Sequence, residues 1–309
     1  MAQAGFTEAP KSVTEMSAGF CNWVYRVDYP APTGAVVTKL FSPLAKLRLA
    51  PALRGFCDEF AGEQELGPRL LFRSEDGLIC DFVPGETLTE QHMHEGPPDL
   101  PRQIAPRLAA LHNLDLEAAR ASAEPPLPPL QVGVDGGRAP ALWEFLDSML
   151  DHIGRQGGER LTSEIVDLAE VRAEVGQMRA RFASLELPVV VGHGDLKPSN
   201  IMRAPEGDGG DDSEGICFID FELSGYHYRG YDLYKLFRTS GDMSRVNLEA
   251  FLQAYLAAQP VAAQPEASGG GSGSEVGAGP PFELMLEELV AETLAAEPLT
   301  WLEAVSRPR

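Results

Sequence analysis

The chain reads HGDLKPSN at residues 193–200 and FIDFE at residues 218–222, and these two stretches decide the fold that we predict. They carry a carboxylate, an amide and a second carboxylate, namely Asp195, Asn200 and Asp220, in the order H-x-D-x-x-x-x-N…D. Phosphoryl transfer from ATP uses these groups, because one carboxylate orients the acceptor hydroxyl while an amide and another carboxylate hold Mg²⁺ on the phosphates. The spacing therefore predicts an ATP- and Mg²⁺-dependent transferase with Asp195 as the catalytic base and Asn200 and Asp220 as metal ligands.

A lysine in the middle of a predicted strand is the candidate phosphate ligand. Lys39 lies in the stretch AVVTKLF at residues 35–41, which is rich in β-branched and apolar residues. If its side chain faces inward, it pairs with the α- and β-phosphates of ATP. If it faces outward, it is an ordinary strand lysine in water. Glu59 and Glu63, on the predicted helix that follows, are candidate partners for the lysine, and we favour Glu59.

Two further segments are candidates for the nucleotide site. Residues 17–22, SAGFCN, precede the first predicted strand and would cover the ATP phosphates, with Gly19 and Asn22 as contacts. A single glycine is a weak signal for such a loop, so an ordinary turn remains open. Asp81 and Val83, just before a Pro-Gly hinge, are the other nucleotide candidates. The sequence contains no G-x-x-x-x-G-K-[ST] motif, which excludes a P-loop NTPase.

Length and charge exclude several classes of protein. The 309 residues suffice for two lobes with a sizeable core, and the net charge of −21 with a pI near 4.6 is strongly acidic. Such a surface repels nucleic acid and anionic lipid, so we predict no nucleic-acid partner. Neither a run of about 18 apolar residues nor a secretory signal occurs, so we predict no membrane insertion. The four cysteines lack C-x-x-C spacing, which favours reduced thiols in a cytoplasmic protein.

Hydrophobic periodicity divides the chain into a strand-rich part, residues 1–85, and a mostly helical part, residues 86–309. The insert at 205–215 is acidic and the segment at 266–281 is rich in Gly and Ser, so both are predicted to be flexible. The expected strands are 22–28, 35–41, 69–72, 78–83, 189–191, 201–203 and 216–219, and the expected helices are 44–66, 101–114, 141–154, 161–184 and 282–304, with a loop at 121–140.

The segment YHYRGYDL at residues 226–233 is dense in aromatic residues beside an acid. Aromatic faces with carboxylates bind small organic cations, which makes Tyr226, Tyr228 and Asp232 candidate substrate ligands. The alternative is that these tyrosines pack in the core behind the metal-binding strand, and some of them are expected to do so.

The stretch FIDFELSGYHYRGYDL at residues 218–233 resembles the signature I-D-F-E-Y-x-x-Y-N-Y-R-G-F-D of the choline/ethanolamine kinase family. The resemblance extends to HGDLKPSN, to LGPRLL at 66–71, to GLICDFVPGETL at 77–88 and to SAGFCNWVYRV at 17–27. It implies an α+β, two-lobed protein-kinase-like fold with a small strand-rich N-lobe and a larger helical C-lobe. It also implies ATP- and Mg²⁺-dependent phosphorylation of ethanolamine or choline for phospholipid synthesis, and it leaves a homodimer open.

The same resemblance assigns residues on the substrate side. Glu222 falls near the amino-alcohol site, and Trp301, in LTWLEA, lies in a stretch like the family's tryptophan-bearing helix. Leu223 replaces a tyrosine and His227 an asparagine, and after Asp232 the chain reads LYKLFR where the family tends to have N-H-F-x-E. The aromatic box for a quaternary ammonium is therefore incomplete, which favours ethanolamine over choline.

Three other functions compete with this one. A protein kinase fits HGDLKPSN, but Gly194 replaces the expected arginine, D-F-E replaces D-F-G and no A-P-E follows. Another kinase of the aminoglycoside-phosphotransferase group fits the catalytic residues but not YHYRGYD. A non-catalytic pseudokinase fits the altered substrate side but not the retained Asp195, Asn200 and Asp220. The last two alternatives stay open.

Overall fold

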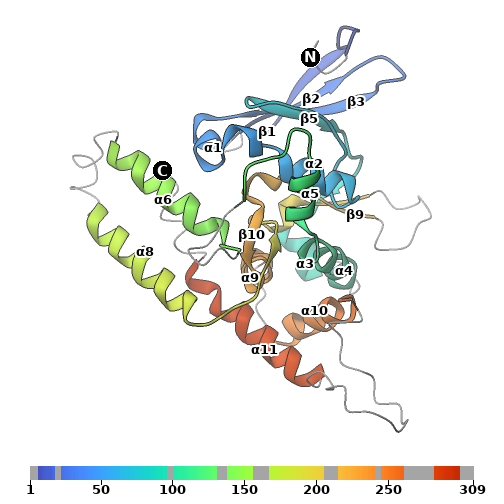
Figure 1. Ribbon diagram of the computed structural model, residues 1–309. Coiled ribbons are helices and arrows are strands. Elements are labelled where there is room, and N and C mark those ends of the chain that lie inside the picture. Colours follow the sequence, from blue (N-terminus) through green and yellow to red (C-terminus); the bar gives the residue numbers. More distant parts are fainter. Residues whose placement is uncertain are drawn as a thin grey trace.

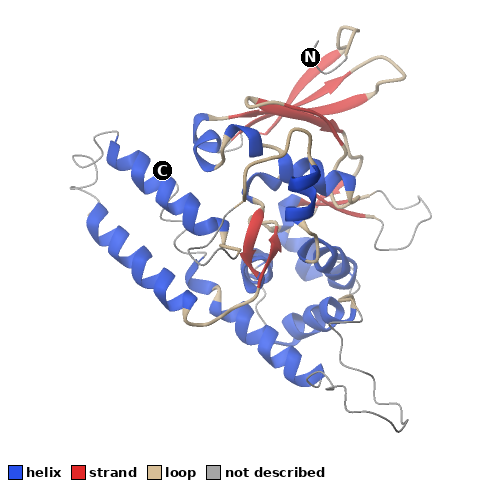
Figure 2. Ribbon diagram, viewed as in Figure 1, coloured by secondary structure: helices blue, strands red, loops and turns tan. Residues whose placement is uncertain are grey.

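A computed structural model shows two parts, a twisted sheet at one end and a larger body of helices below it (Figure 1). The structure describes residues 6–17, 22–95, 100–130, 138–155, 167–204, 215–240, 245–260 and 282–299. Within these, strands dominate up to residue 81 and helices dominate afterwards (Figure 2). This is the division that the hydrophobic pattern predicts, although the boundary at residue 85 stays a prediction.

The N-terminal sheet is antiparallel, with strand order β1-β2-β3-β5-β4. In β3 the buried Val36 lies opposite Val27 and packs with Ile79 on one face, while Lys39 lies opposite Leu78. Successive side chains of a strand point to opposite faces, so Lys39 lies on the other face from Val36. The strands are β1 (Ser12–Ser17), β2 (Asn22–Asp28), β3 (Ala35–Phe41), β4 (Leu70–Arg73) and β5 (Gly77–Asp81).

Two short helices connect β3 to β4, where the sequence predicts a mostly helical segment. Helix α1 (Pro43–Arg48) begins after Ser42, whose hydroxyl accepts a hydrogen bond from the Ala45 amide, and it has proline in its first turn. Helix α2 (Phe56–Glu63) follows a 3₁₀ turn at Pro51–Leu53. Both helices bring charged side chains close to the loops of the helical part.

The helical part is built around one large apolar core. Helix α4 packs against α10, α9 packs against α11, and the long helices α6 and α8 lie side by side (Figure 1). Apolar residues of α4 at helical spacing, among them Ile104 and Leu108, lie in this core, as the sequence predicts. The helices are α3 (Glu90–Glu95), α4 (Leu100–His112), α5 (Leu116–Ser122), α6 (Ala141–Arg155), α8 (Leu168–Ala183), α9 (Arg229–Ser240), α10 (Arg245–Ala257) and α11 (Phe282–Ala295).

Two small sheets position the stretches quoted at the outset. Strand β7 (Val189–Gly192) pairs with β10 (Gly225–Tyr228), and β8 lies between β6 and β9. The loop 193–200 leaves β7 and the loop 219–224 leaves β9. The two loops lie next to each other, since the Ile219 amide donates to the Asn200 backbone oxygen at 3.0 Å and Nε2 of His193 lies 2.9 Å from the Ile219 oxygen. The remaining strands are β6 (Glu86–Thr87), β8 (Ile201–Arg203) and β9 (Ile216–Phe218), with 3₁₀ turns at Pro198–Asn200 and Phe221–Leu223.

Some expectations differ from the structure. Strands β1, β6 and β10 and helices α3, α5, α9 and α10 are additional elements, and α5 ends inside the segment predicted as a loop. The insert at 205–214, the segment 266–281 and the start of the predicted helix 161–184 lie outside the described residues. Among the helices that the structure describes, none combines the length and the apolar character needed to cross a membrane.

Candidate active site

Asp195 is a buried carboxylate held between two ammonium groups. Its Oδ1 lies 2.7 Å from Nζ of Lys235, and its Oδ2 accepts a hydrogen bond of 3.0 Å from Lys197. Burial alone would raise the pKa of Asp195, but the charges of Lys235 and Lys197 outweigh it and hold the pKa well below the usual range. Asp195 is therefore a stable carboxylate that can accept a hydrogen bond from a hydroxyl group.

Gly194 explains why the loop carries H-G-D. This residue has a φ of 76°, and a Cβ there would collide with the carbonyl oxygen of Leu223. Only glycine adopts that conformation at this close approach without strain. The arginine that a protein kinase would carry at this position cannot be accommodated.

Asn200 joins the two loops. Its side-chain nitrogen donates to the backbone oxygen of Asp195 at 2.9 Å and to Oδ2 of Asp195 at 3.2 Å. Its backbone oxygen accepts a hydrogen bond from the amide of Ile219 at 3.0 Å, which brings Asn200 beside Asp220. An amide that uses its nitrogen in this way keeps its oxygen for an acceptor role.

Asp220 has left-handed backbone geometry, with φ 70° and ψ 57°, which is uncommon for a residue other than glycine and occurs at functional sites. Its Oδ1 accepts a hydrogen bond of 2.5 Å from Nζ of Lys39. Burial raises the pKa of Asp220, and the ammonium of Lys39 lowers it further than burial raises it. Lys39 thus faces inward, as the phosphate-ligand hypothesis requires.

The residues present fit a magnesium ion. Mg²⁺ prefers oxygen ligands and is usually held by one or two protein side chains together with phosphate oxygens and water. Asn200 and Asp220 supply an amide and a carboxylate oxygen from adjacent loops. Among the described residues, no group of three His, Cys, Asp or Glu side chains could hold a metal by itself, so a metal here would depend on the nucleotide.

The expected pair of Lys39 with Glu59 is wrong. Glu59 accepts a hydrogen bond of 2.7 Å from Arg73, which directs it away from the lysine. The neighbouring residue, Asp58, faces the site instead, where burial raises its pKa and the charge of Lys39 partly offsets that rise. Neighbouring residues of a helix point about 100° apart. Asp58 therefore faces the site, whereas Glu59 points away from it toward Arg73.

Glu222 connects the loop after β9 to the N-terminal part. Its Oε1 accepts a hydrogen bond of 3.0 Å from Arg48 of α1, and its Oε2 accepts one from Asn22 of β2. The Arg48–Glu222 pair is nearly buried, with side chains 9% and 12% exposed. The expected role of Glu222 as a substrate ligand is therefore not supported, because Arg48 already neutralises it. Asn22 binds this carboxylate rather than lying in a loop open to a nucleotide.

Asp232 is a loop anchor and not a substrate ligand. Its Oδ2 accepts a hydrogen bond of 2.6 Å from the His193 amide, and its Oδ1 accepts one of 2.9 Å from the Gly194 amide. His112 of α4 lies 3.3 Å from Oδ2. The side chain is 1% exposed, so the expectation that it contacts substrate is wrong. Asp232 instead fixes the backbone that carries Asp195.

The two tyrosines predicted to bind substrate lie in the core, as the alternative interpretation of this segment predicts. Tyr228 is buried beside Phe182, and its hydroxyl accepts a hydrogen bond of 3.2 Å from Trp143. Tyr226 is 1% exposed, and the Arg138 guanidinium lies 5.0 Å from its ring centroid. Neither forms an open aromatic wall. Gly19 and Trp301 lie outside the described residues, so their roles stay predictions.

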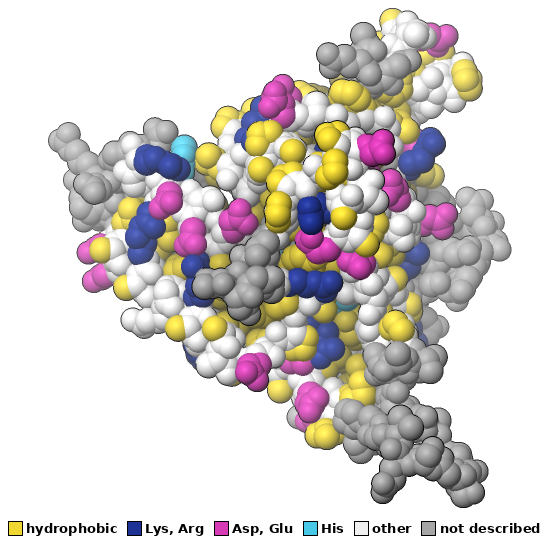
Figure 3. All heavy atoms as spheres, viewed as in Figure 1, with side chains coloured by type: hydrophobic (Ala, Val, Ile, Leu, Met, Phe, Trp, Pro, Cys, Tyr) yellow, Lys and Arg dark blue, Asp and Glu magenta, His cyan; other side chains and the backbone are white. Residues whose placement is uncertain are grey.

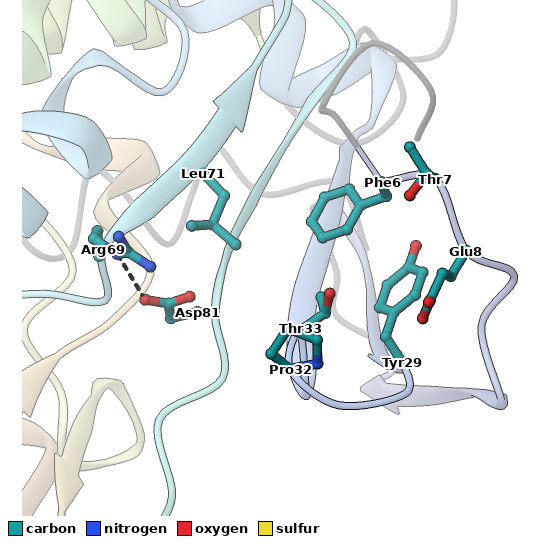
Figure 4. Close-up of a pocket in the computed structure, with 9 residues that line it drawn as sticks. All are labelled: Phe6, Thr7, Glu8, Tyr29, Pro32, Thr33, Arg69, Leu71 and Asp81. Atoms are coloured by element: carbon teal, nitrogen blue, oxygen red, sulfur yellow. Dashed lines mark hydrogen bonds and ion pairs between the residues drawn. The ribbon is translucent and has the colours of Figure 1, made fainter.

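Asp81 is the last residue of β5, the strand between β3 and β4. It pairs with Arg69 at 2.9 Å and lines a cavity of about 550 Å³ that also contains the stacked rings of Phe6 and Tyr29 (Figure 4). Asp81 lies opposite Val36 of β3 in the sheet. Val36 and Lys39 are three residues apart on that strand, which separates the backbone positions of Asp81 and Lys39 by about 10 Å along the strand direction. A nucleotide contact of Asp81 or of the neighbouring Val83 stays a prediction.

The surface agrees with the acidic composition. Acidic side chains are scattered over the visible face with basic ones among them, and no single large basic patch is visible there (Figure 3). The three cysteines that the structure describes, Cys57, Cys80 and Cys217, are free thiols, as predicted.

A comparison with known families shows to which family the chain belongs. The sequence profile of the choline/ethanolamine kinase family matches residues 13–255, which include every described side chain of the site. The chain belongs to this family. The resemblance found in FIDFELSGYHYRGYDL is thereby confirmed.

Individual relatives are distant. A probable ethanolamine kinase of Arabidopsis thaliana is 24% identical over 229 residues, which are 72% of this chain and 54% of the relative, so the chain spans about half the length of that protein. The structure superposes on the solved ethanolamine kinase of Plasmodium vivax with a TM-score of 0.71, and the two sequences are 17% identical. The superposition covers 97% of this chain and 76% of the Plasmodium vivax chain. LicA is a choline kinase of Streptococcus pneumoniae. Its complex with AMP superposes on this structure with a TM-score of 0.57 at 17% sequence identity, and the superposition covers 97% of this chain and 85% of the LicA chain. These structures confirm the predicted two-lobed, protein-kinase-like fold.

Proposed function

We propose that this protein transfers the terminal phosphoryl group of ATP to the hydroxyl of a small amino alcohol, ethanolamine or choline. The observation that carries the proposal is the convergence of Asp195, Asn200, Asp220 and Lys39, which come from both parts of the fold. Each belongs to the chemistry of phosphoryl transfer, in which positioning and charge stabilisation supply most of the rate. The relatives described above are kinases of ethanolamine or choline, and LicA holds AMP on the same fold.

Each residue has a separate task. Asp195 accepts the hydrogen bond of the acceptor hydroxyl and aligns its oxygen with the terminal phosphate. Asn200 and Asp220 hold Mg²⁺, which supplies charge neutralisation on the β- and γ-phosphates when bound. Lys39 binds the α- and β-phosphates and gives up part of its contact with Asp220 to do so. Asp232 keeps the loop backbone in place throughout.

Ethanolamine is the preferred acceptor in this proposal. Choline carries a trimethylammonium group, which has no N–H and is bound by aromatic faces. Tyr226 and Tyr228 are buried in the core and offer it no wall. The –NH₃⁺ group of ethanolamine donates three hydrogen bonds and is served by carboxylates and carbonyl oxygens.

An acceptor panel tests the proposal. ADP release would be measured with MgATP and ethanolamine, choline, an aminoglycoside or no acceptor, with Asp195→Asn as the inactive control. We expect the highest kcat/KM with ethanolamine. A clear preference for choline overturns the substrate assignment, and turnover with the aminoglycoside alone assigns the chain to that other group. Nucleotide binding without turnover for any acceptor identifies a pseudokinase.

A further inference from the structure

Lys235 is a buried lysine in the middle of helix α9. Its side chain is 2% exposed, and its helix neighbours Leu233 and Leu236 are in the apolar core. Lysine is almost never fully buried unless it is paired, because removing the ammonium from water is costly. A charge at this position therefore needs a compensating partner.

That partner is the catalytic loop. Nζ of Lys235 lies 2.7 Å from Oδ1 of Asp195 and donates to the backbone oxygen of Gly194 at 3.0 Å. The ring of Tyr231, one turn earlier in α9, has its centroid 5.6 Å from the same ammonium. One cation thus binds both the side chain of Asp195 and the peptide oxygen that precedes it.

These contacts make the two oxygens of Asp195 different. Oδ1 points toward the helix core and is occupied by Lys235, which cannot move without leaving its packing. Oδ2 is bound by Asn200 at 3.2 Å and by Lys197 at 3.0 Å, and the Lys197 side chain is 34% exposed. The side of the carboxylate that reaches solvent is therefore the Oδ2 side.

We propose that Lys235 is a positioning residue, which holds Oδ1 of Asp195 so that Oδ2 is the atom presented to the acceptor hydroxyl. The proposal rests on the proposed phosphotransferase function. The ion pair with Nζ of Lys235 holds Oδ1, and the hydrogen bond from the same Nζ to the Gly194 oxygen holds the ammonium in place, so the carboxylate is restrained from rotating about its Cβ–Cγ bond. A reacting group misplaced by about 1 Å can lose about 10²-fold in rate, so this rotation matters for kcat.

A double-mutant cycle tests the proposal. The variants are Lys235→Met, which keeps the length of the side chain without its charge, Asp195→Asn, and the two combined. Arg238→Met is the control, because Arg238 is an exposed cation on the same helix. We expect Lys235→Met to lower kcat by about 10–10²-fold, with the Kd of MgATP within about twofold of the original. In the Asp195→Asn background the same change should alter kcat by less than about threefold.

The cycle separates positioning from general packing. If Lys235→Met lowers kcat equally in both backgrounds, or leaves kcat unchanged when Asp195 is present, the proposal is overturned. A reduction of kcat that disappears when Asp195 is replaced supports it, because a packing defect would persist.

The same variants, unfolded by urea without substrates, distinguish this proposal from the proposed function. Removal of the Lys235 charge leaves Oδ1 of the buried Asp195 without its cation, and only the partly exposed Lys197 still pairs with the carboxylate at Oδ2. Lys235→Met should therefore lower the urea midpoint clearly when Asp195 is present and much less in the Asp195→Asn background. Coupling in stability without turnover for any acceptor means that the pair exists but the phosphotransferase function fails. Turnover without such coupling overturns the role of Lys235 and leaves the function standing.

Discussion

Nζ of Lys39 lies 2.5 Å from Oδ1 of Asp220, although 181 residues separate the two in the chain. The contact joins strand β3 of the sheet to the loop after β9. Because Asp220 is also the proposed metal ligand, Lys39 and Mg²⁺ would share one carboxylate in the proposed function. In the proposed function, Lys39 would meet the phosphates from this position beside Asp220.

Asp220→Asn should raise the Mg²⁺ concentration needed for turnover and weaken MgATP binding. The amide keeps the shape of the side chain but removes the charge that both Lys39 and the metal require. The measurement is a titration of activity with Mg²⁺ and of melting temperature with MgATP. Asp151→Asn, which changes an exposed carboxylate on α6, is a matched control. Unchanged metal dependence in Asp220→Asn would show that the metal assignment is wrong.

Asp232→Asn should destabilise the protein by about 3–5 kcal/mol at neutral pH, because the buried charge is lost and the amide nitrogen would face one of the two backbone N–H groups, of His193 or Gly194, that the carboxylate now accepts. Burial raises the pKa of Asp232, but its contact with His112 and the nearby His227 and His193 lower it well below the usual range. A carboxyl whose folded pKa is lowered contributes stability that is lost as pH falls, beginning at about pH 5.

Urea unfolding of the original protein and Asp232→Asn at pH 7, 4 and 3 checks this. We expect the difference in unfolding free energy to be largest at pH 7 and to shrink clearly by pH 3, below the ordinary pKa of an aspartate. A difference that is constant or grows in acid would contradict the anchoring role of the carboxylate.

Arg48→Met should cost more stability than Arg48→Met combined with Glu222→Gln. In the single variant Glu222 remains buried without its cation, whereas the double variant removes both charges. Burial and the charge of Asp220 already raise the pKa of Glu222, so loss of Arg48 leaves it still less able to hold its charge. The measurement is the urea midpoint of the original protein, of the single variant and of the double variant. Equal midpoints for the two variants would show that the Arg48–Glu222 pair does not join the two parts of the fold in solution.

The three described cysteines should resist alkylation in the folded protein. Burial raises the pKa of Cys57 and of Cys80 to about 12 and that of Cys217 to about 11. The reactive thiolate is then roughly 300–3,000-fold scarcer than for a free cysteine of pKa near 8.5. Mass spectrometry of a Cys21→Ser variant treated with iodoacetamide, with and without urea, measures the protection. Rapid labelling without urea would contradict the burial of these thiols.

The sequence predicts those parts of the site whose chemistry lies in one short stretch. Asp195, Asn200 and Asp220 can be identified because the spacing along the loops is itself the signal. Strands 22–28 and 35–41 are predictable because their β-branched residues are bounded by turn residues, and both agree with the structure.

Partners that come from elsewhere in the chain could not be predicted. In the sequence, Arg48 and Lys235 look like ordinary helix cations. Their role is visible only in the fold, where Arg48 pairs with Glu222 and Lys235 pairs with Asp195. Asp58 and Glu59 are adjacent in the sequence. Helix α2 has only eight residues, so its hydrophobic pattern is too short to predict which of the two carboxylates faces the site. Helix α9 is buried on most sides, including its Asp232 and Lys235, so it shows no polar face for a pattern to detect.

Direct detection of the product tests the central claim. The protein, MgATP and ethanolamine would be followed by ³¹P NMR, with Asp195→Ala alongside and Asp151→Ala, an exposed carboxylate on α6, as the matched control. We predict a phosphomonoester signal of phosphoethanolamine growing as ATP is consumed, at the same rate in the Asp151 variant and about 10²–10⁴-fold slower in the Asp195 variant. Absence of the phosphoethanolamine signal, or an equal rate in Asp195→Ala, would contradict the account.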